Sequence, residues 1–142
     1  MTRLFVDTSG WASFFISAEP THKQAVQSFI TAHKQKHAIS TSNYVIAELV
    51  ALLQSPLRVQ RSQIFTIIDT IKTTPYLDVI HIGADIDAAA WQLCKSRLDK
   101  KWSLVDCASF VLMQQHDIQA ALTTDHHFEQ AGFTRLLNPT RT

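Results

Sequence analysis

Leu4-Phe5-Val6-Asp7-Thr8-Ser9, close to the start of the chain, is a short apolar stretch that stops abruptly at a carboxylate. A brief apolar run bounded by turn-forming residues is typical of a buried β-strand. Beyond it, short apolar segments alternate with longer stretches of helical periodicity. This alternation predicts an α/β sandwich with a mostly parallel central sheet of about 4–5 short strands.

The expected elements follow from periodicity and from the residues that interrupt it. Val45, Leu49 and Leu52 recur at helical spacing and mark the buried face of one helix, which Ser55-Pro56 ends. In the same way, the chain predicts strands at residues 4–6, 37–40, 77–81, 118–122 and 133–137. Helices are expected at residues 11–16, 20–30, 42–53, 58–72, 83–98, 103–115 and 126–131.

The composition limits the functional class. A length of 142 residues is typical of one domain, so residues 1–142 are expected to form a single domain. Lys and Arg total 13 against 12 Asp and Glu, which excludes a generally basic nucleic-acid coat. No apolar run approaches the about 18 residues of a membrane span, and Asp7 interrupts the first apolar run before it could form a signal peptide. We therefore expect a cytoplasmic protein that does not enter membranes.

Four carboxylates stand out from their surroundings. Asp7 and Asp125 each follow an apolar strand candidate, whereas Glu48 and Asp106 lie within otherwise apolar helical segments. Ligands of parallel α/β folds gather beyond the carboxyl ends of the strands. The four positions are therefore candidates for one functional site.

Each carboxylate also has a structural interpretation. Asp7 can cap a helix, Ser103 with Asp106 fits a capping box, and Asp125 can be a turn residue. Glu48 is harder to explain in this way, because burial of an unpaired carboxylate costs several kcal/mol and no Lys or Arg occurs between residues 37 and 57. Its partner must come from elsewhere in the fold or be a metal ion.

A metal ion would explain all four positions together. Carboxylates that converge raise one another's pKa unless a cation compensates their charge. Mg²⁺ and Mn²⁺ prefer oxygen ligands and commonly take substrate phosphates as further ligands. Such an ion lowers the pKa of a bound water and stabilises the leaving oxygen of a phosphodiester. The acidic residues therefore indicate a divalent-metal site suited to phosphodiester chemistry.

One family resemblance spans nearly the whole chain. The sequence resembles the PIN domain family in four motifs, which occur in the order Leu4-Phe5-Val6-Asp7-Thr8-Ser9, Ala47-Glu48-Leu49, Ser103-Leu104-Val105-Asp106 and Leu122-Thr123-Thr124-Asp125. PIN domains are Mg²⁺- or Mn²⁺-dependent ribonucleases, and small bacterial ones are commonly VapC toxins of toxin–antitoxin pairs. The resemblance implies that Asp7, Glu48, Asp106 and Asp125 form a catalytic metal pocket in which a metal-activated water hydrolyses RNA. It also implies a homodimer and a cognate antitoxin that binds in or beside the active site.

Further residues are candidates for substrate contacts. Ser9 and Ser103 fall where the PIN family often has a hydroxyl near the pocket. Lys100, Lys101 and Trp102 end the basic segment 95–102, which begins in the last turn of the helix predicted over residues 83–98. This segment can be a solvated helix end, or an edge that follows RNA phosphates while Trp102 stacks on an unpaired base.

His126 and His127 directly follow Asp125. They can simply begin a solvated loop. Alternatively, either imidazole can touch a phosphate or add a nitrogen ligand, which would shift the metal preference toward Mn²⁺ or a borderline metal.

Other classes of protein fit the sequence less well. A haloacid-dehalogenase-type phosphatase also begins with a strand that ends in Asp, but it requires a second Asp where Ser9 stands. A receiver domain requires adjacent acidic residues near the N-terminus and a late Lys after a strand, and neither feature is found. Within the PIN family, the alternatives are an RNA-processing nuclease that is not a toxin and a catalytically silent module that binds RNA or protein.

Overall fold

The computed structural model describes residues 3–139 of the chain. None of the helices within these residues is long and apolar enough to cross a membrane. Along the chain, the elements are β1 (Arg3–Val6), α1 (Thr8–Phe15), α2 (His22–Lys34), β2 (Ala38–Ser42), α3 (Asn43–Gln54), α4 (Arg61–Thr73), β3 (Leu77–Ile80), α5 (Ala84–Ser96), α6 (Leu104–Gln115), β4 (Ala120–Leu122), α7 (His127–Gln130) and β5 (Thr134–Arg135).

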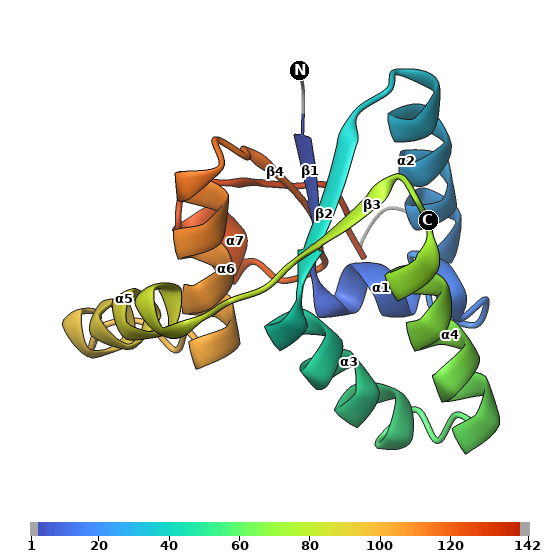
Figure 1. Ribbon diagram of the computed structural model, residues 1–142, viewed down its shortest axis with the longest axis horizontal. Helices are drawn as coiled ribbons and strands as arrows, with labels where there is room; N and C mark the ends of the chain where they lie inside the picture. Colours follow the sequence, from blue (N-terminus) through green and yellow to red (C-terminus); the bar gives the residue numbers. More distant parts are fainter. Residues whose placement is uncertain (1–2, 140–142) are drawn as a thin grey trace.

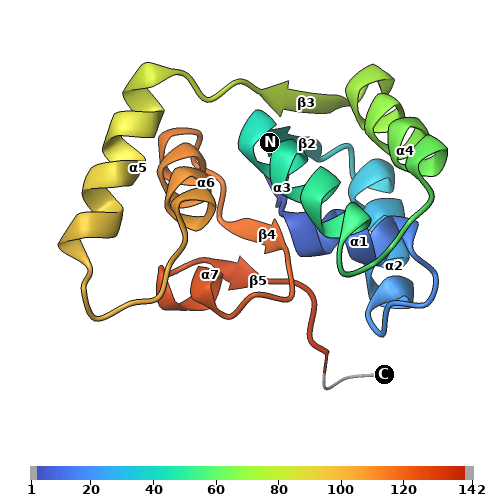
Figure 2. The same cartoon turned by 90° about the horizontal axis from the view of Figure 1, so that it is seen from below.

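The strands form a five-stranded sheet in the order β3-β2-β1-β4-β5, and every neighbouring pair is parallel. Figures 1 and 2 show helices on both sides of this sheet, with α5 and α6 on one side and α1, α2 and α4 on the other. Parallel strands need helical crossovers, and these bury both faces of the sheet. The expected α/β sandwich is confirmed, and its sheet is parallel throughout.

β1 occupies the centre of the sheet, and its register with β4 positions the functional end of the fold. Phe5 and Val6 are fully buried between the two helical layers. Val6 pairs with Leu122, and the backbone N–H of Asp7 donates to the Leu122 carbonyl over 3.1 Å. The segments that leave β1 and β4 therefore emerge side by side at the carboxyl edge of the sheet.

Helix α1 packs closely against this edge. A Cβ atom at Gly10 would clash with the Leu122 carbonyl oxygen, so the approach of α1 to β4 requires glycine at this position. Trp11 Nε1 donates to Thr41 Oγ1 over 3.1 Å, and that hydroxyl donates to the Val6 carbonyl over 2.9 Å. These buried hydrogen bonds tie α1 to β2 and β1.

Several element boundaries differ from the expected ones. Helix α1 begins at Thr8 rather than at residue 11, because the Trp11 N–H already donates to the Asp7 carbonyl. β2 continues to Ser42, because its last residues pair with β3. β4 and β5 are shorter than expected, at residues 120–122 and 134–135. Pairing between strands sets these limits, and local periodicity does not contain that information.

Candidate active site

A cavity of about 600 Å³ lies at the carboxyl ends of β1 and β4. It brings together side chains that are more than a hundred residues apart in the sequence. The four candidate carboxylates all line it, together with Ser9, Ser103, Lys101, His126 and His127. The complete lining is Asp7, Thr8, Ser9, Glu48, Leu52, Lys101, Ser103, Asp106, Thr124, Asp125, His126 and His127.

Asp7 is the most deeply buried of the four carboxylates, with 4% of its surface exposed. Its Oδ2 accepts a hydrogen bond of 2.9 Å from Thr123 Oγ1, whereas Oδ1 has no hydrogen-bond partner among the described residues. Its pKa is raised from 3.8 to about 7, mainly by burial and also by the charges of Glu48 and Asp106, while the Thr8 backbone and the Thr123 hydroxyl lower it. Asp7 occupies the N-cap position of α1 but its side chain caps nothing, so the helix-cap interpretation is wrong.

Asp106 has both a structural role and a place in the cavity. It forms the predicted capping box of α6, in which its Oδ2 accepts from the Ser103 N–H over 3.1 Å and its own N–H donates to Ser103 Oγ. The same Oδ2 lies 2.9 Å from His127 Nδ1. Burial raises the pKa of Asp106 and the charge of Asp125 adds to this effect, while the bonds from Ser103 and His127 oppose it.

Glu48 reaches the cavity from the middle of α3. Its side chain is half-buried. Its Oε1 accepts a hydrogen bond of 2.5 Å from Thr8 Oγ1. Within residues 3–139, no Lys, Arg or His forms an ion pair with it. A threonine therefore orients Glu48 without neutralising its charge.

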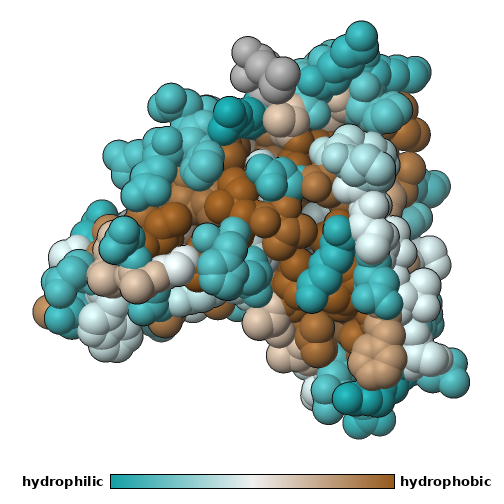
Figure 3. Space-filling view, viewed as in Figure 1, coloured by the Kyte–Doolittle hydropathy of each residue, from teal (hydrophilic) through white to brown (hydrophobic). Residues whose placement is uncertain are grey.

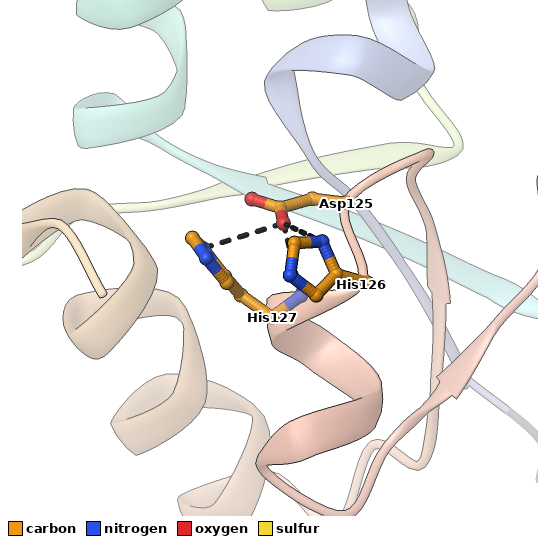
Figure 4. Close-up of side chains that lie close together, drawn as sticks. All are labelled: Asp125, His126 and His127. Atoms are coloured by element: carbon orange, nitrogen blue, oxygen red, sulfur yellow. Dashed lines mark hydrogen bonds and ion pairs between the residues drawn. The ribbon is translucent and has the colours of Figure 1, made fainter. Parts of the chain in front are cut away.

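Asp125 lies in the turn between β4 and α7. Its Oδ1 accepts from the His127 N–H over 2.9 Å, as the turn interpretation predicts. The same oxygen lies 3.3 Å from His127 Nδ1 and 3.8 Å from His126 Nδ1. Figure 4 shows both imidazole rings beside this carboxylate. The turn thus holds one oxygen and two nitrogen donors at the rim of the cavity.

Sequence reasoning missed two hydroxyl residues that support the carboxylates. Thr8 donates to Glu48, and Thr123 donates to Asp7. Because the Thr123 proton is used on Asp7, Ser9 must donate to Thr123 across their 3.1 Å contact, while Ser9 Oγ accepts from the Thr124 N–H. Both threonines lie within the motifs that contain Asp7 and Asp125, and this position is the signal that could have identified them.

The side chains of the basic segment face two different cavities, with Lys101 in one and Trp102 in the other. Lys101 lines the acidic cavity, whereas the ammonium of Lys100 lies 4.0 Å from Asp99. Trp102 borders a neighbouring cavity of about 540 Å³ and donates from Nε1 to Gln130. The Arg97 guanidinium lies over the Trp102 ring at 4.9 Å from its centroid. One face of the indole is therefore already covered by this chain.

The lining fits a hard divalent cation. Asp7 Oδ1 is a buried oxygen without a partner among residues 3–139, which is the kind of atom that a metal ion would satisfy. Asp7 and Asp106 each have a pKa raised by burial and by a neighbouring carboxylate, so an uncompensated cluster resists ionisation. Carboxylate oxygens are the donors that Mg²⁺ and Mn²⁺ prefer.

A parallel α/β sandwich with an acidic cavity at its strand ends is the arrangement that the PIN resemblance implies. Residues 4–134 match the PIN domain, and the chain therefore belongs to the PIN domain family. This membership confirms the family resemblance that the four motifs indicated.

One relative is similar to this chain over nearly its whole length, in sequence and in structure. The chain is 29% identical over 133 residues to the 23S rRNA-specific endonuclease VapC20 of Mycobacterium tuberculosis. The matched region covers 94% of this chain and 97% of the relative. The crystal structure of that toxin, described as sarcin-ricin loop cleaving, superposes with a TM-score of 0.81 at 28% identity and covers 95% of this chain and 99% of that one.

More distant structures share the fold. FitAcB from Neisseria gonorrhoeae matches with a TM-score of 0.68 at 14% identity, covering 98% of this chain and 99% of that one. A toxin–antitoxin complex from Klebsiella pneumoniae matches with a TM-score of 0.58 at 19% identity, covering 97% of this chain and 98% of that one. At these identities the likeness concerns the fold alone.

Proposed function

We propose that the chain is a single PIN domain, residues 1–142, that acts as a Mg²⁺- or Mn²⁺-dependent endoribonuclease and as the toxin of a type II toxin–antitoxin pair. The observation that carries the proposal is the convergence of four carboxylates on one cavity, where a buried oxygen of Asp7 has no partner among residues 3–139. The 23S rRNA specificity of the matched relative supports an RNA substrate. Both an RNA substrate and an antitoxin would be met in the cytoplasm.

The four carboxylates would have different roles in binding the metal. Asp7 and Asp106 are the principal ligands, and Glu48 and Asp125 complete the pocket directly or through waters. Thr123 and Thr8 hold the carboxylates of Asp7 and Glu48 in place, as groups that orient metal ligands commonly do. When bound, the ion supplies a water of lowered pKa and stabilises the leaving oxygen of the phosphodiester.

Residues around the cavity would position the RNA. Lys101 lines the cavity, and Lys100 precedes Lys101 in the sequence. The ammonium groups of both residues are therefore suited to contacts with the phosphates of the RNA backbone. Ser9 and Ser103 line the cavity and accept hydrogen bonds from the N–H groups of Thr124 and Asp106, so both are candidates for substrate contacts as well as supports of the site. An RNA base could stack on Trp102 only at the face that Arg97 leaves free.

The decisive experiment is inducible expression of the wild type and of Asp7→Asn, followed by mapping of RNA ends, with 23S rRNA examined first. We expect growth arrest and discrete cuts only with the wild type. With purified protein, cleavage should stop in EDTA and return with Mg²⁺. Asp106→Asn should be inactive, whereas the matched control Asp78→Asn, which removes an exposed carboxylate of β3, should cleave normally. Normal cleavage by Asp7→Asn or Asp106→Asn would refute the assignment.

The same experiment distinguishes the alternatives within the family. An RNA-processing nuclease would cleave RNA without arresting growth, and no antitoxin gene would lie beside its own. A silent module would bind RNA but leave it intact at every Mg²⁺ concentration. RNA cleavage that accompanies growth arrest supports the toxin assignment, provided that co-expression of a neighbouring gene prevents both.

A homodimer and an antitoxin complex are also part of the proposal. Figure 3 shows apolar surface gathered in the middle of one face and between α3 and α4. Phe65 on α4 and Trp91 on α5 are each more than half exposed. Contiguous exposed apolar surface, rather than a single exposed side chain, marks protein interfaces. Light scattering of the purified chain should give twice the mass of the monomer, and a monomer at all concentrations would contradict the homodimer.

A further inference from the structure

The rim of the acidic cavity carries nitrogen donors, which a pocket built only for Mg²⁺ does not require. Asp125, His126 and His127 each offer one ligand atom, and these atoms all lie within 4.8 Å of one another. Figure 4 shows the two imidazoles and the carboxylate gathered around one space. Such a mixture of donors differs chemically from the carboxylates at Asp7 and Glu48.

The local fold holds these donors together. The His127 N–H donates to Asp125 Oδ1, which fixes the start of α7 against the turn. The side chain of His127 is only 20% exposed, and the His126 ring lies 4.6 Å from it, centroid to centroid. The nearest carboxylate outside the turn is Asp106, whose Oδ2 is 2.9 Å from His127 Nδ1.

The distance of each imidazole nitrogen from the Asp125 carboxylate suits coordination to one shared ion. Metal–nitrogen and metal–oxygen bonds of about 2.0–2.2 Å place the ligand atoms of one ion roughly 3–4 Å apart. His127 Nδ1 lies 3.3 Å from Asp125 Oδ1, and His126 Nδ1 lies 3.8 Å from the same oxygen. Ligation requires each imidazole to carry its proton on Nε2, so a bound ion would replace the hydrogen bond between His127 Nδ1 and Asp106 Oδ2.

We propose that Asp125, His126 and His127 form a mixed nitrogen–oxygen metal site at the rim of the cavity, which selects a divalent first-row metal ion such as Mn²⁺, Co²⁺ or Zn²⁺ over Mg²⁺. Imidazole nitrogen ligates these ions, most favourably the borderline Zn²⁺, whereas Mg²⁺ strongly favours oxygen. Asp106 adjoins both His127 and the rest of the acidic pocket, so the site is continuous with that pocket. The inference rests on the proposed function, because it assigns the preferred ion of that same pocket.

The test compares metal binding by the wild type, His126→Ala and His127→Ala. The His126 side chain is 65% exposed, so its removal leaves the fold undisturbed even if loss of His127 weakens the turn. His81→Ala is the matched control, because it removes an exposed imidazole that follows β3. Calorimetric titration with Mn²⁺ and with Mg²⁺ measures selectivity, and pulsed electron paramagnetic resonance of bound Mn²⁺ detects imidazole nitrogen directly.

We expect an imidazole nitrogen signal on Mn²⁺ in the wild type and in His81→Ala, and its weakening in each rim variant. Each rim variant should lose about tenfold or more in Mn²⁺ affinity and much less in Mg²⁺ affinity. A wild type whose bound Mn²⁺ shows no nitrogen, or variants that retain the wild-type ratio of Mn²⁺ to Mg²⁺ affinity, would overturn the inference. If that wild type still cleaves RNA in Mg²⁺, only the rim site fails. If nitrogen is detected but RNA is never cleaved, the site stands and the nuclease proposal fails.

Discussion

Replacing Asp7 with Asn is expected to stabilise the metal-free protein at neutral pH while abolishing RNA cleavage. The reason is the position of this carboxylate, which is 4% exposed and has an oxygen without a partner among the described residues. Burial and the neighbouring carboxylates make its charged form costly in the folded state. An amide of the same shape removes that charge and disables the proposed metal ligand at once.

The size and sign of the effect follow from the pKa of Asp7. That pKa is raised from 3.8 to about 7 on folding, so the folded state binds the proton more tightly than the unfolded chain. The stabilisation from this proton is fully present below pH 3.8 and is lost as the pH rises to about 7. Between about pH 5 and about pH 7, the wild type should lose about 2 kcal/mol of unfolding free energy relative to the variant.

Urea unfolding in EDTA, followed by circular dichroism at several pH values, measures this difference. Comparison with Asp7→Asn cancels the contribution of other titrating groups, and Asp78→Asn controls for loss of an exposed carboxylate. Saturating Mg²⁺ should then restore stability to the wild type and not to Asp7→Asn. Parallel pH dependence of the wild type and Asp7→Asn would refute the reasoning, because Asp7 would then carry no buried charge.

Three further predictions concern packing and metal dependence. Gly10→Ala should lower the unfolding free energy by about 2 kcal/mol or more, because its Cβ clashes with the Leu122 carbonyl. Gly83→Ala meets no atom within 4 Å and should cost less than about 1 kcal/mol in the same urea assay; equal losses would contradict the clash. Thr8→Val should reduce RNA cleavage by about tenfold or more, because it frees Glu48, while thermal unfolding stays near that of the wild type. Excess EDTA should lower the thermal midpoint of Mg²⁺-loaded protein, and an unchanged midpoint would argue against a bound ion.

The order of strands and helices was predictable because it rests on local patterns. The apolar run at residues 4–6 and the helical stripe through Val45 and Leu49 each indicate one element without reference to the rest of the chain. The capping box of Ser103 and Asp106 is equally local, and it forms as expected. Such signals span a few residues, so the sequence alone identifies the elements and the carboxylates that stand out within them.

The contacts that define the cavity could not be obtained in this way. Thr123 meets Asp7 only because the parallel register of β1 and β4 pairs Leu122 with Val6, a relation across more than a hundred residues. The same register leaves one oxygen of Asp7 without a partner in the described part of the chain. The burial of the Asp7 carboxylate, and with it the raised pKa of that group, is a property of the packed layers and is not predicted by the residues on either side of it.

The sequence by itself determined the fold class and the family, because hydrophobic periodicity and the order of four short motifs are carried by neighbouring residues. Only the tertiary structure decided which donor groups share the cavity. It brought Asp106 against His127 and Glu48 against Thr8, and it placed Arg97 over the ring of Trp102. Contacts between distant segments depend on how the layers pack, and this information arises only once the whole chain has folded.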